Sequence, residues 1–420
     1  GIVPFPTNPW MSTDSQIKVK TNRGAGRGVA ADEMRRHNLG AVLERLHLLG
    51  PLSRSDLASF TGLNRSTIAD LVSQLTALGL AEETPALATG PGRPSPVVQT
   101  RPQGAIVLAV ELAVDSIAVA TVGLGGHVYN RVRVDRPRGR FSPEETVHDI
   151  DKLAGPLVGS LPAQHLLAGV GVAIVGITRR SDGFVHFAPN LDWRDVPLAE
   201  MLGTGLDLGA PVMVANEADL GALGEHRRGT HQGVRHLIYV SGEVGIGTGV
   251  IIDGKPLLGS AGYAGEAGHT MINPNGIECR CGSLGCWETE AGEAALVRRI
   301  RYLDGVTGVG VVDSIARQAM AGDVTTMKAI DEVGRWLGLG IGNLINLFNP
   351  ERVVLGGLYD RLYPYLEEAV TQGVDVSALT APRKMATLAR SDLEGDAPLI
   401  GAAELVLSGV IADPARAANK

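Results

Sequence analysis

The chain has 420 residues, a formal net charge of −7 and three cysteines. Its length exceeds one typical hydrophobic core, so two or three domains are expected. No uncharged apolar run is long enough to span a membrane and no secretory signal opens the chain, so we expect a cytoplasmic protein rather than a membrane or secreted one. An odd number of thiols without a pairing pattern also argues against a disulfide framework.

The first 31 residues are expected to lie outside the folded domains. Residues 1–10 carry no charge and precede Met11, which resembles a natural start, so we interpret them as a cloning remnant. The polar, Gly/Arg-rich stretch that follows predicts a flexible segment. Residues 11–101 carry 11 Lys and Arg against 8 Asp and Glu, whereas the rest of the chain carries 27 against 37. Only the N-terminal part therefore has a charge that suits nucleic acid, although a solvated face could carry the same surplus.

Residues 32–100 predict three helices followed by a β-ribbon. The first helix ends at Gly50-Pro51, a short helix runs from Ser53 to Phe60, and Asn64 caps a third helix after a tight turn. Helical spacing gives the first and third helices one apolar face each: Leu39, Val42, Leu43, Leu46 and Leu49, and Ile68, Leu71, Val72, Leu75 and Leu78. This pattern is typical of a helix-turn-helix.

The third helix leaves short polar and basic side chains on its open face, where a recognition helix would contact bases. Residues 81–100 predict a two-stranded wing, and an arginine at its tip can enter a minor groove. We therefore predict a winged helix-turn-helix whose DNA-binding residues are Arg54, Asn64, Arg65, Ser66, Thr67 and Arg93. A small three-helix bundle with an incidental loop is the alternative.

From residue 101 onward, β-branched runs and glycines alternate with helical segments. Strands are predicted at 105–112, 116–124, 127–134, 169–175, 212–216, 237–241 and 250–252, and helices near 143–158, 287–303, 310–321, 325–348 and 361–372. The alternation favours an α/β architecture of two lobes with a cleft. We place the first lobe at 101–215, completed by a C-terminal helix at about 398–410, and the second lobe at 216–397.

All three cysteines fall within eight residues of the second lobe. Cys279, Cys281 and Cys286 lie in a glycine-rich run, and His269 stands ten residues before the first of them. Three thiolates and one imidazole give the closed, four-coordinate shell that structural zinc prefers. We therefore predict one structural Zn²⁺ in a zinc loop of residues 269–286. The alternative is three buried thiols and a satisfied histidine.

The run Gly265-Glu266-Ala267-Gly268-His269, followed by the cysteine motif that ends at Glu288, resembles the signature of the ROK family of repressors, open reading frames and sugar kinases. The resemblance covers residues 32 to about 410. It implies an actin-like, sugar-kinase-like domain. A winged helix in front of this domain is the arrangement of the family's transcriptional regulators, similar to the xylose and N-acetylglucosamine repressors.

The resemblance also implies a set of sugar-binding residues in the cleft. The positions that match the family's motifs are Asn190, Asn216, Glu217, Glu266, His269 and Glu288. Carboxylates can accept hydrogen bonds from two vicinal hydroxyls, and an amide both donates and accepts. His269 can serve two ligands if zinc takes one ring nitrogen and a hydroxyl the other. The alternative is a set of polar residues without a ligand.

Three departures from the kinase pattern lead us to expect no catalysis. The phosphate-binding Asp-x-Gly-Gly-Thr of the kinases is replaced by residues 111–116, which lack both glycines, and the second phosphate loop reads Glu243-Val244-Gly245. The catalytic aspartate corresponds to Glu217, which is one methylene longer. Only Gly356-Gly357, on the family's adenosine side, still fits a kinase, and that pair fits a strand-end turn equally well.

The sequence thus predicts a sugar-responsive transcriptional regulator that contains zinc and is not an enzyme. Its partners would be operator DNA with an inverted repeat, a sugar or sugar phosphate, and further copies of the chain in a homodimer or homotetramer. An ATP-dependent sugar kinase with a DNA-binding head is the alternative. A DNA-bound scaffold that responds to a protein partner is a third possibility.

Overall fold

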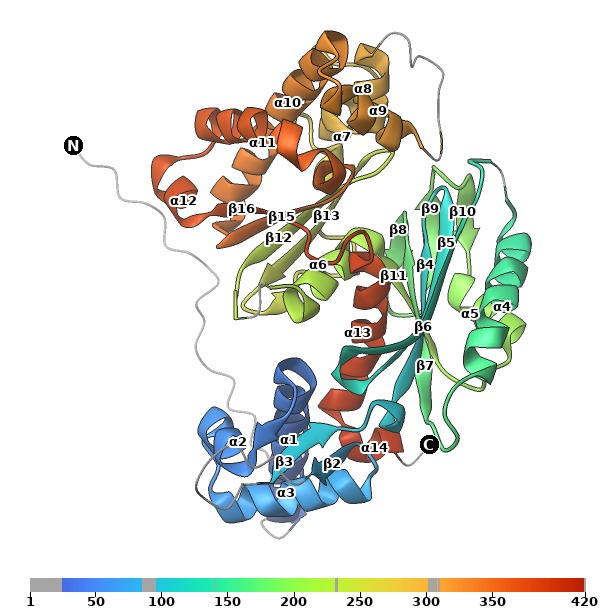
Figure 1. Ribbon diagram of the computed structural model, residues 1–420, viewed down its shortest axis with the longest axis vertical. Coiled ribbons are helices and arrows are strands. Elements are labelled where there is room, and N and C mark those ends of the chain that lie inside the picture. The colour runs from blue at the N-terminus through green and yellow to red at the C-terminus, as the bar shows by residue number, and fades with distance from the viewer. Residues whose placement is uncertain are drawn as a thin grey trace, which may run out of the picture.

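The computed structural model describes residues 25–84, 96–139, 141–230, 233–300, 308 and 310–418. A helical head lies at the bottom of Figure 1, and two sheets with their own helices lie above it. The expected cloning remnant and the wing tip with Arg93 fall outside the described residues. Within the described part of the chain, every helix is too short or too polar to cross a bilayer.

The head contains three helices and a small antiparallel sheet. Its elements are α1 (Ala25–Leu49), α2 (Arg54–Thr61), α3 (Arg65–Ala77), β1 (Leu52–Ser53), β2 (Ala81–Thr84) and β3 (Val97–Thr100), with strand order β1-β3-β2. Ser53 and Asp56 form a capping box at α2, and the Asn64 side chain caps α3. The predicted helices are confirmed. However, α1 begins at Ala25, within the segment expected to be flexible.

A single hydrophobic core joins the head to the body of the protein. It runs from Leu43 of α1 and Leu75 of α3 through Val410 of α13 (Ala397–Ala412) to Ala109 in the first large sheet, all of them buried. Burying apolar area across this boundary favours a fixed contact between the head and the body. Leu49 departs from the predicted apolar face, since it lies 41% exposed at the end of α1.

The first large sheet has the strand order β11-β7-β4-β5-β6. Its strands are β4 (Ile106–Leu112), β5 (Ser116–Gly123), β6 (His127–Asp135), β7 (Leu167–Ile174) and β11 (Val212–Asn216), flanked by the short helices η1 (Pro102–Gly104) and η2 (Leu124–Gly126). Alternate side chains of β4 point to opposite faces: Leu108 and Val110 pack with α4 (Pro143–Gly159) and α5 (Leu198–Leu206), and Ala109 packs toward α13. A small sheet of β8 (Ile177–Arg179), β9 (Phe184–Ala188) and β10 (Trp193–Val196), which the sequence did not predict, extends this body.

The second large sheet has the order β14-β13-β12-β15-β16. Its strands are β12 (Leu237–Gly242), β13 (Ile246–Ile252), β14 (Lys255–Pro256), β15 (Arg352–Gly357) and β16 (Thr387–Arg390). Its helices are α7 (Trp287–Ala291), α8 (Glu293–Arg299), α9 (Val311–Met320), α10 (Val324–Phe348), α11 (Leu358–Ser377) and α12 (Thr380–Met385). The single helix predicted at 287–303 is wrong, because Gly292 has extended backbone angles and separates α7 from α8.

Two helices connect the sheets. Helix α13 (Ala397–Ala412) packs on the first sheet and leads to α14 (Pro414–Ala418), and α6 (Glu217–Arg228) packs on the second. The two helices touch closely, since a Cβ at Gly401 would clash with the Leu220 carbonyl. Leu220 faces the core around α13, and Ala222 faces β12 and β13. We call the first large sheet with its helices the first body, and the second large sheet with its helices the second body. Helix α6 therefore contacts both bodies, and α13 continues from the sheets down to the head (Figure 1).

Candidate functional site

The four predicted metal ligands come together in the loop between η3 (Ala267–His269) and α7. The ligand atoms of His269, Cys279, Cys281 and Cys286 all lie within 4.8 Å of one another. The Cys281 and Cys286 sulfurs are 3.6 Å apart, and the Cys279 sulfur is 3.7 Å from Nδ1 of His269. Bonds of about 2.3 Å in a tetrahedral site would separate two sulfurs by about 3.8 Å, so the spacing fits one zinc ion.

Backbone pairing gives this loop its tight shape. Isolated bridges join Met271 to Cys286 and Glu278 to Leu284. Gly285 has a φ of 64°, and a side chain there would clash with the Asn273 carbonyl. The glycine is therefore needed for the turn that returns the chain from the second to the third cysteine.

Three of the predicted sugar-binding side chains adjoin the cysteine cluster. Glu266 immediately precedes η3, and the Ala267 N–H donates to Oγ1 of Thr248 on β13 at 3.3 Å, which anchors this turn. Oε1 of Glu288 lies 3.7 Å from Nδ1 of His269. Glu266 is exposed, but the surrounding loop partly desolvates its carboxyl group and, with Glu288 nearby, raises its pKa, although His269 opposes the shift. The structure thus brings Glu266, His269 and Glu288 into one group.

Asn216 and Glu217 stand where β11 passes into α6. Oδ1 of Asn216 accepts from the Ala218 N–H at 2.8 Å, and its Nδ2 donates to the Gly176 carbonyl at 3.0 Å. Asn216 is therefore the N-cap of α6, a role that the sequence interpretation missed. Glu217 is only 5% exposed. Burial, together with Glu243 and Glu111, raises its pKa well above the usual range and favours its neutral form.

Two further polar residues near this group were not predicted. Asp219 is in the first turn of α6 and is 8% exposed. Burial raises the pKa of Asp219 to about 7, with Glu266 adding to the shift and Arg180 opposing it. Nη1 of Arg180 is buried and lacks a hydrogen-bond partner among the described residues. The available sequence signal for Asp219 was that it and Glu217 both lie within three residues after Asn216, whereas nothing in the sequence marked Arg180.

Asn190 is tied to the zinc loop. It lies between β9 and β10, and its Oδ1 accepts a hydrogen bond of 2.8 Å from Nη1 of Arg280. Arg280 stands between Cys279 and Cys281, so the loop that gathers the predicted metal ligands also reaches the small sheet of the first body. The predicted sugar ligand Asn190 is therefore positioned by an arginine that the sequence interpretation did not single out.

Ion pairs fill the region that corresponds to the first phosphate loop of the kinases. Oε2 of Glu111 accepts from Arg133 at 2.7 Å. Arg138, which follows β6, lies 3.2 Å from Asp115 and binds both carboxylate oxygens of Glu293 at 2.7 and 2.9 Å. Because Glu293 begins α8, the Arg138–Glu293 pair links the two bodies.

The second phosphate-loop position is occupied by the half-buried side chain of Glu243. Burial, followed by the nearby carboxylates of Glu111 and Asp115, raises the pKa of Glu243 to about 8. The Glu243 N–H donates to the Gly245 carbonyl at 3.0 Å, so this amide is already used within the loop. Neither feature resembles a cradle of free N–H groups for phosphate.

The predicted DNA-contacting residues lie around the start of α3. Asn64, Arg65 and Ser66 are exposed and Thr67 is half-buried, while Oδ1 of Asn64 accepts from both the Thr67 N–H and the Ser66 hydroxyl. Arg54 forms a two-bond ion pair with Glu83 of β2, at 2.7 and 2.8 Å. Arg54 is therefore the one described member of the set that is already paired with a carboxylate.

Comparison with known proteins places this geometry in a family. The sequence profile described as "ROK family" matches residues 107–408. The chain belongs to the ROK family. A xylose repressor from Caldicellulosiruptor bescii is 31% identical over 375 residues, a match that covers 86% of this chain and 93% of the repressor.

Other ROK relatives match this chain over different lengths. A glucokinase from Streptomyces coelicolor is 33% identical over 267 residues, which cover 60% of this chain and 81% of the kinase. Among solved structures, a ROK family transcriptional regulator described as a homolog of E. coli MLC superposes with a TM-score of 0.76 and 26% identity, covering 93% of this ROK chain and all of the other.

Proposed function

We propose that this ROK protein is a sugar-responsive transcriptional regulator that binds operator DNA through a winged helix-turn-helix and senses sugar through a non-catalytic domain. The observation that carries the proposal is the head of residues 32–100. A structural match that covers 93% of the chain cannot leave this head out, and the matched protein is a transcriptional regulator. The glucokinase match, at 60% of the chain, is partial. We divide the part of the chain that follows the head into a first lobe, residues 101–215 with α13, and a second lobe, residues 216–397.

In this proposal, α3 is the recognition helix and the β2–β3 ribbon is the wing. The exposed side chains of Arg65 and Ser66 at the start of α3 would contact base edges, with Asn64 and Thr67 beside them. Arg54 would exchange its bond to Glu83 for a DNA phosphate. A dimer would place two such helices on an inverted repeat, because the protein's two-fold axis and that of the operator coincide.

The sensor site would be the group around Glu266, His269 and Glu288, with Asn216, Glu217 and Asn190 at its border. Carboxylates that accept hydrogen bonds suit the hydroxyl groups of a sugar. Two observations argue against phosphoryl transfer. Arg138 and Glu293 pair between the two bodies, and the Glu243 N–H is already hydrogen-bonded within its own loop. The burial of Glu217 further favours a protonated carboxyl where a kinase needs an ionised base.

Zinc would be held by the three thiolates and by Nδ1 of His269. Four protein ligands leave no open position for water, so the ion would be structural. Its role would be to fix the loop that carries Arg280 and the turn that carries Glu266. Nε2 of His269 would remain available for a hydrogen bond to a sugar hydroxyl.

The test begins with an operator selected from a library of random DNA duplexes by repeated binding to the full chain. Fluorescence anisotropy then measures operator affinity with xylose, glucose, N-acetylglucosamine or the corresponding sugar phosphates. Arg65→Ala should weaken operator binding by about 1–3 kcal/mol. Arg335→Ala, at an exposed arginine on α10, is the matched control and should bind as the unmodified chain does.

The sensor half of the proposal is tested by the same titration. One of these sugars should change operator affinity, commonly by about 5–150-fold for allosteric proteins. Calorimetric binding of a sugar without any change in operator affinity would refute the sensor role and favour a protein partner as the signal. Turnover of ATP with any panel sugar at about 1 per second or faster would refute the non-catalytic assignment.

A further inference from the structure

We infer that helix α6 transmits the state of the sugar site to the DNA-binding head through a buried junction of Arg228, Glu404 and His47. The inference rests on the proposed function and specifies how the sensor and the head would be coupled. We call these three side chains, with the Gly125 backbone that they bind, the α1 junction.

Helix α6 reaches from the sugar site to the head. It begins with Glu217, next to its N-cap Asn216, and ends at Arg228. Its 12 residues correspond to about 18 Å at 1.5 Å per residue. Every residue from Glu217 to Glu225 is buried, so the helix is enclosed by protein along most of its length. A displacement at its first turn therefore cannot be absorbed by solvent-exposed chain.

The α1 junction joins four separate segments of the chain. Nε of Arg228 donates to Glu404 of α13 at 2.6 Å, and its Nη1 donates to the carbonyls of His47 at 2.9 Å and Gly125 at 3.1 Å. Nε2 of His47 lies 2.9 Å from Oε2 of Glu404, and the Gly125 N–H donates to Nδ1 of His47 at 2.9 Å. Arg228 also contacts the His47 ring.

The hydrogen-bond partners of His47 determine which of its ring nitrogens carries the proton. Nδ1 of His47 accepts from a backbone N–H, so Nε2 carries the hydrogen and donates to Glu404. Burial also lowers the pKa of His47, which favours this neutral ring. His47 and Glu404 are each 1% exposed. Water therefore cannot replace a junction bond that is broken, and charge-assisted bonds of this kind are sensitive to small changes of position.

The helix surfaces around the junction make the contact stiff. A Cβ at Gly40 of α1 would clash with the Ile411 carbonyl of α13, so these two backbones touch. Next to Arg228, Arg227 donates to Glu44 of α1 at 3.0 Å. The last turn of α6 therefore holds α1 by two consecutive arginines.

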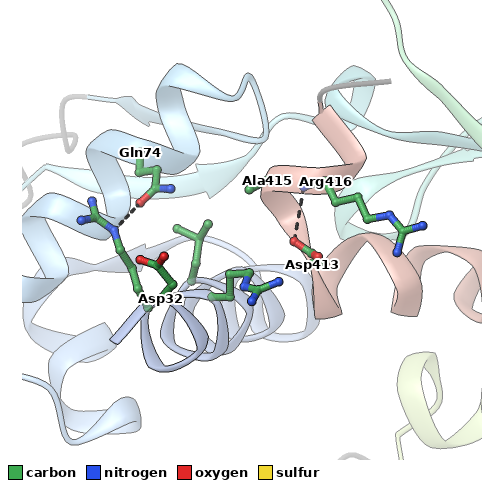
Figure 2. Close-up of a pocket in the computed structure, with 8 residues that line it drawn as sticks. Asp32, Gln74, Asp413, Ala415 and Arg416 are labelled. Atoms are coloured by element: carbon green, nitrogen blue, oxygen red, sulfur yellow. Dashed lines mark hydrogen bonds between the residues drawn. The ribbon is translucent and has the colours of Figure 1, made fainter. Parts of the chain in front are cut away.

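The opposite end of α1 has more room. A pocket of about 470 Å³ separates its N-terminal part from α14, and its lining includes Asp32, Arg35, Asp413 and Arg416. Nε of Arg35 donates to Gln74 of α3 at 3.1 Å, within the head. On the other side of the pocket, Asp413 accepts from the backbone N–H of Arg416 in α14 (Figure 2). The hydrogen bonds that hold α1 to α6 and α13 therefore lie at its C-terminal end, whereas this pocket lies beside its N-terminal part.

The test compares coupling in the full chain and in Arg228→Lys. Lysine keeps the positive charge, but its single nitrogen cannot take the separate positions from which Nε and Nη1 of Arg228 donate to Glu404 and to the two carbonyls. Fluorescence anisotropy measures operator affinity with and without whichever of xylose, glucose or N-acetylglucosamine the chain binds, and the coupling ratio is the factor between these two affinities. We expect a ratio of about 5–150 for the unmodified chain and a ratio near 1 for Arg228→Lys. Calorimetry should find the sugar affinity of Arg228→Lys within about twofold of that of the unmodified chain. Arg335→Lys, on the exposed side of α10, is the matched control and should keep the full ratio.

Two outcomes overturn different statements. A normal ratio in folded Arg228→Lys refutes the junction, even though the proposed function stands. A ratio of 1 in the unmodified chain refutes the proposed function, and the junction's role falls with it. If circular dichroism shows that Arg228→Lys is unfolded, Glu404→Gln replaces it, since this variant keeps the shape of the side chain but removes the charge that Arg228 and His47 bind. It should reduce the ratio, and an unchanged ratio would refute the junction.

Discussion

Replacing Asp219 by asparagine should stabilise the unliganded protein at alkaline pH. The start of a helix normally favours a negative charge. Here burial is the larger effect, because it raises the pKa of Asp219 from 3.8 to about 7 in spite of Arg180. The folded chain therefore keeps a proton that the unfolded chain has already lost between pH 3.8 and 7. The contribution of Asp219 to stability therefore falls as pH rises through that interval and is lowest above it.

The size of the effect follows from the shift. About three pKa units at 1.36 kcal/mol each give about 4 kcal/mol between ionised Asp219 and a neutral side chain of the same shape. Urea unfolding, followed by tryptophan fluorescence, measures the difference between Asp219→Asn and the unmodified chain. The variant should be more stable by a few kcal/mol at pH 8, and the difference should shrink steadily toward pH 4.

A matched control is Asp331→Asn on the exposed surface of α10, which should change stability by less than about 0.5 kcal/mol at either pH. The reasoning is refuted if Asp219→Asn is no more stable than the unmodified chain at pH 8, or if its advantage is the same at pH 4. Either result would mean that Asp219 is ionised without a cost when the chain folds.

Three other predictions concern charge and metal. Elemental analysis should find one zinc per chain, and Cys281→Ser should lower both the zinc content and the melting temperature; full zinc content in this variant would contradict the ligand set. For Glu404, the charge of Arg228 and the hydrogen bonds from His47 and Arg228 hold the pKa below its usual 4.5, so Glu404→Gln should cost about 1–3 kcal/mol at pH 7, with the difference fading as pH falls below about 4.5 in denaturation curves; a difference constant with pH would exclude this origin. A double-mutant cycle on Arg138→Ala and Glu293→Gln should give a coupling of about 0.5–3 kcal/mol in unfolding, whereas additive effects would show that the pair does not hold the bodies together.

The parts of this fold that sequence predicts well are those fixed by neighbours in the chain. Ser53 and Asn64 cap helices that begin one residue later, so the start of α2 and of α3 could be read directly. The cysteine cluster was equally local, since its ligands lie within one loop and the structure brings all four together.

Long-range contacts account for what was missed. His47 and Glu404 are 357 positions apart, and Asn190 and Arg280 are 90 apart, so no local pattern could pair them. Asn216 fits the sugar-binding pattern, but only the structure reveals that its amide also caps α6. Gly292 could have signalled the break between α7 and α8, yet a single glycine inside a helical pattern is ambiguous.

The shared core between head and body sets a rule for building hybrid regulators. A fusion that cuts this chain at residue 101 and attaches another sensor would strip the head of Val410 and the other α13 side chains that cover Leu43. The apolar face of the head would then be exposed to solvent and would promote aggregation with other copies of the fusion protein. A functional hybrid should therefore carry α13 and α14 together with the head, so that the unit transplanted is discontinuous in sequence and takes both ends of the chain.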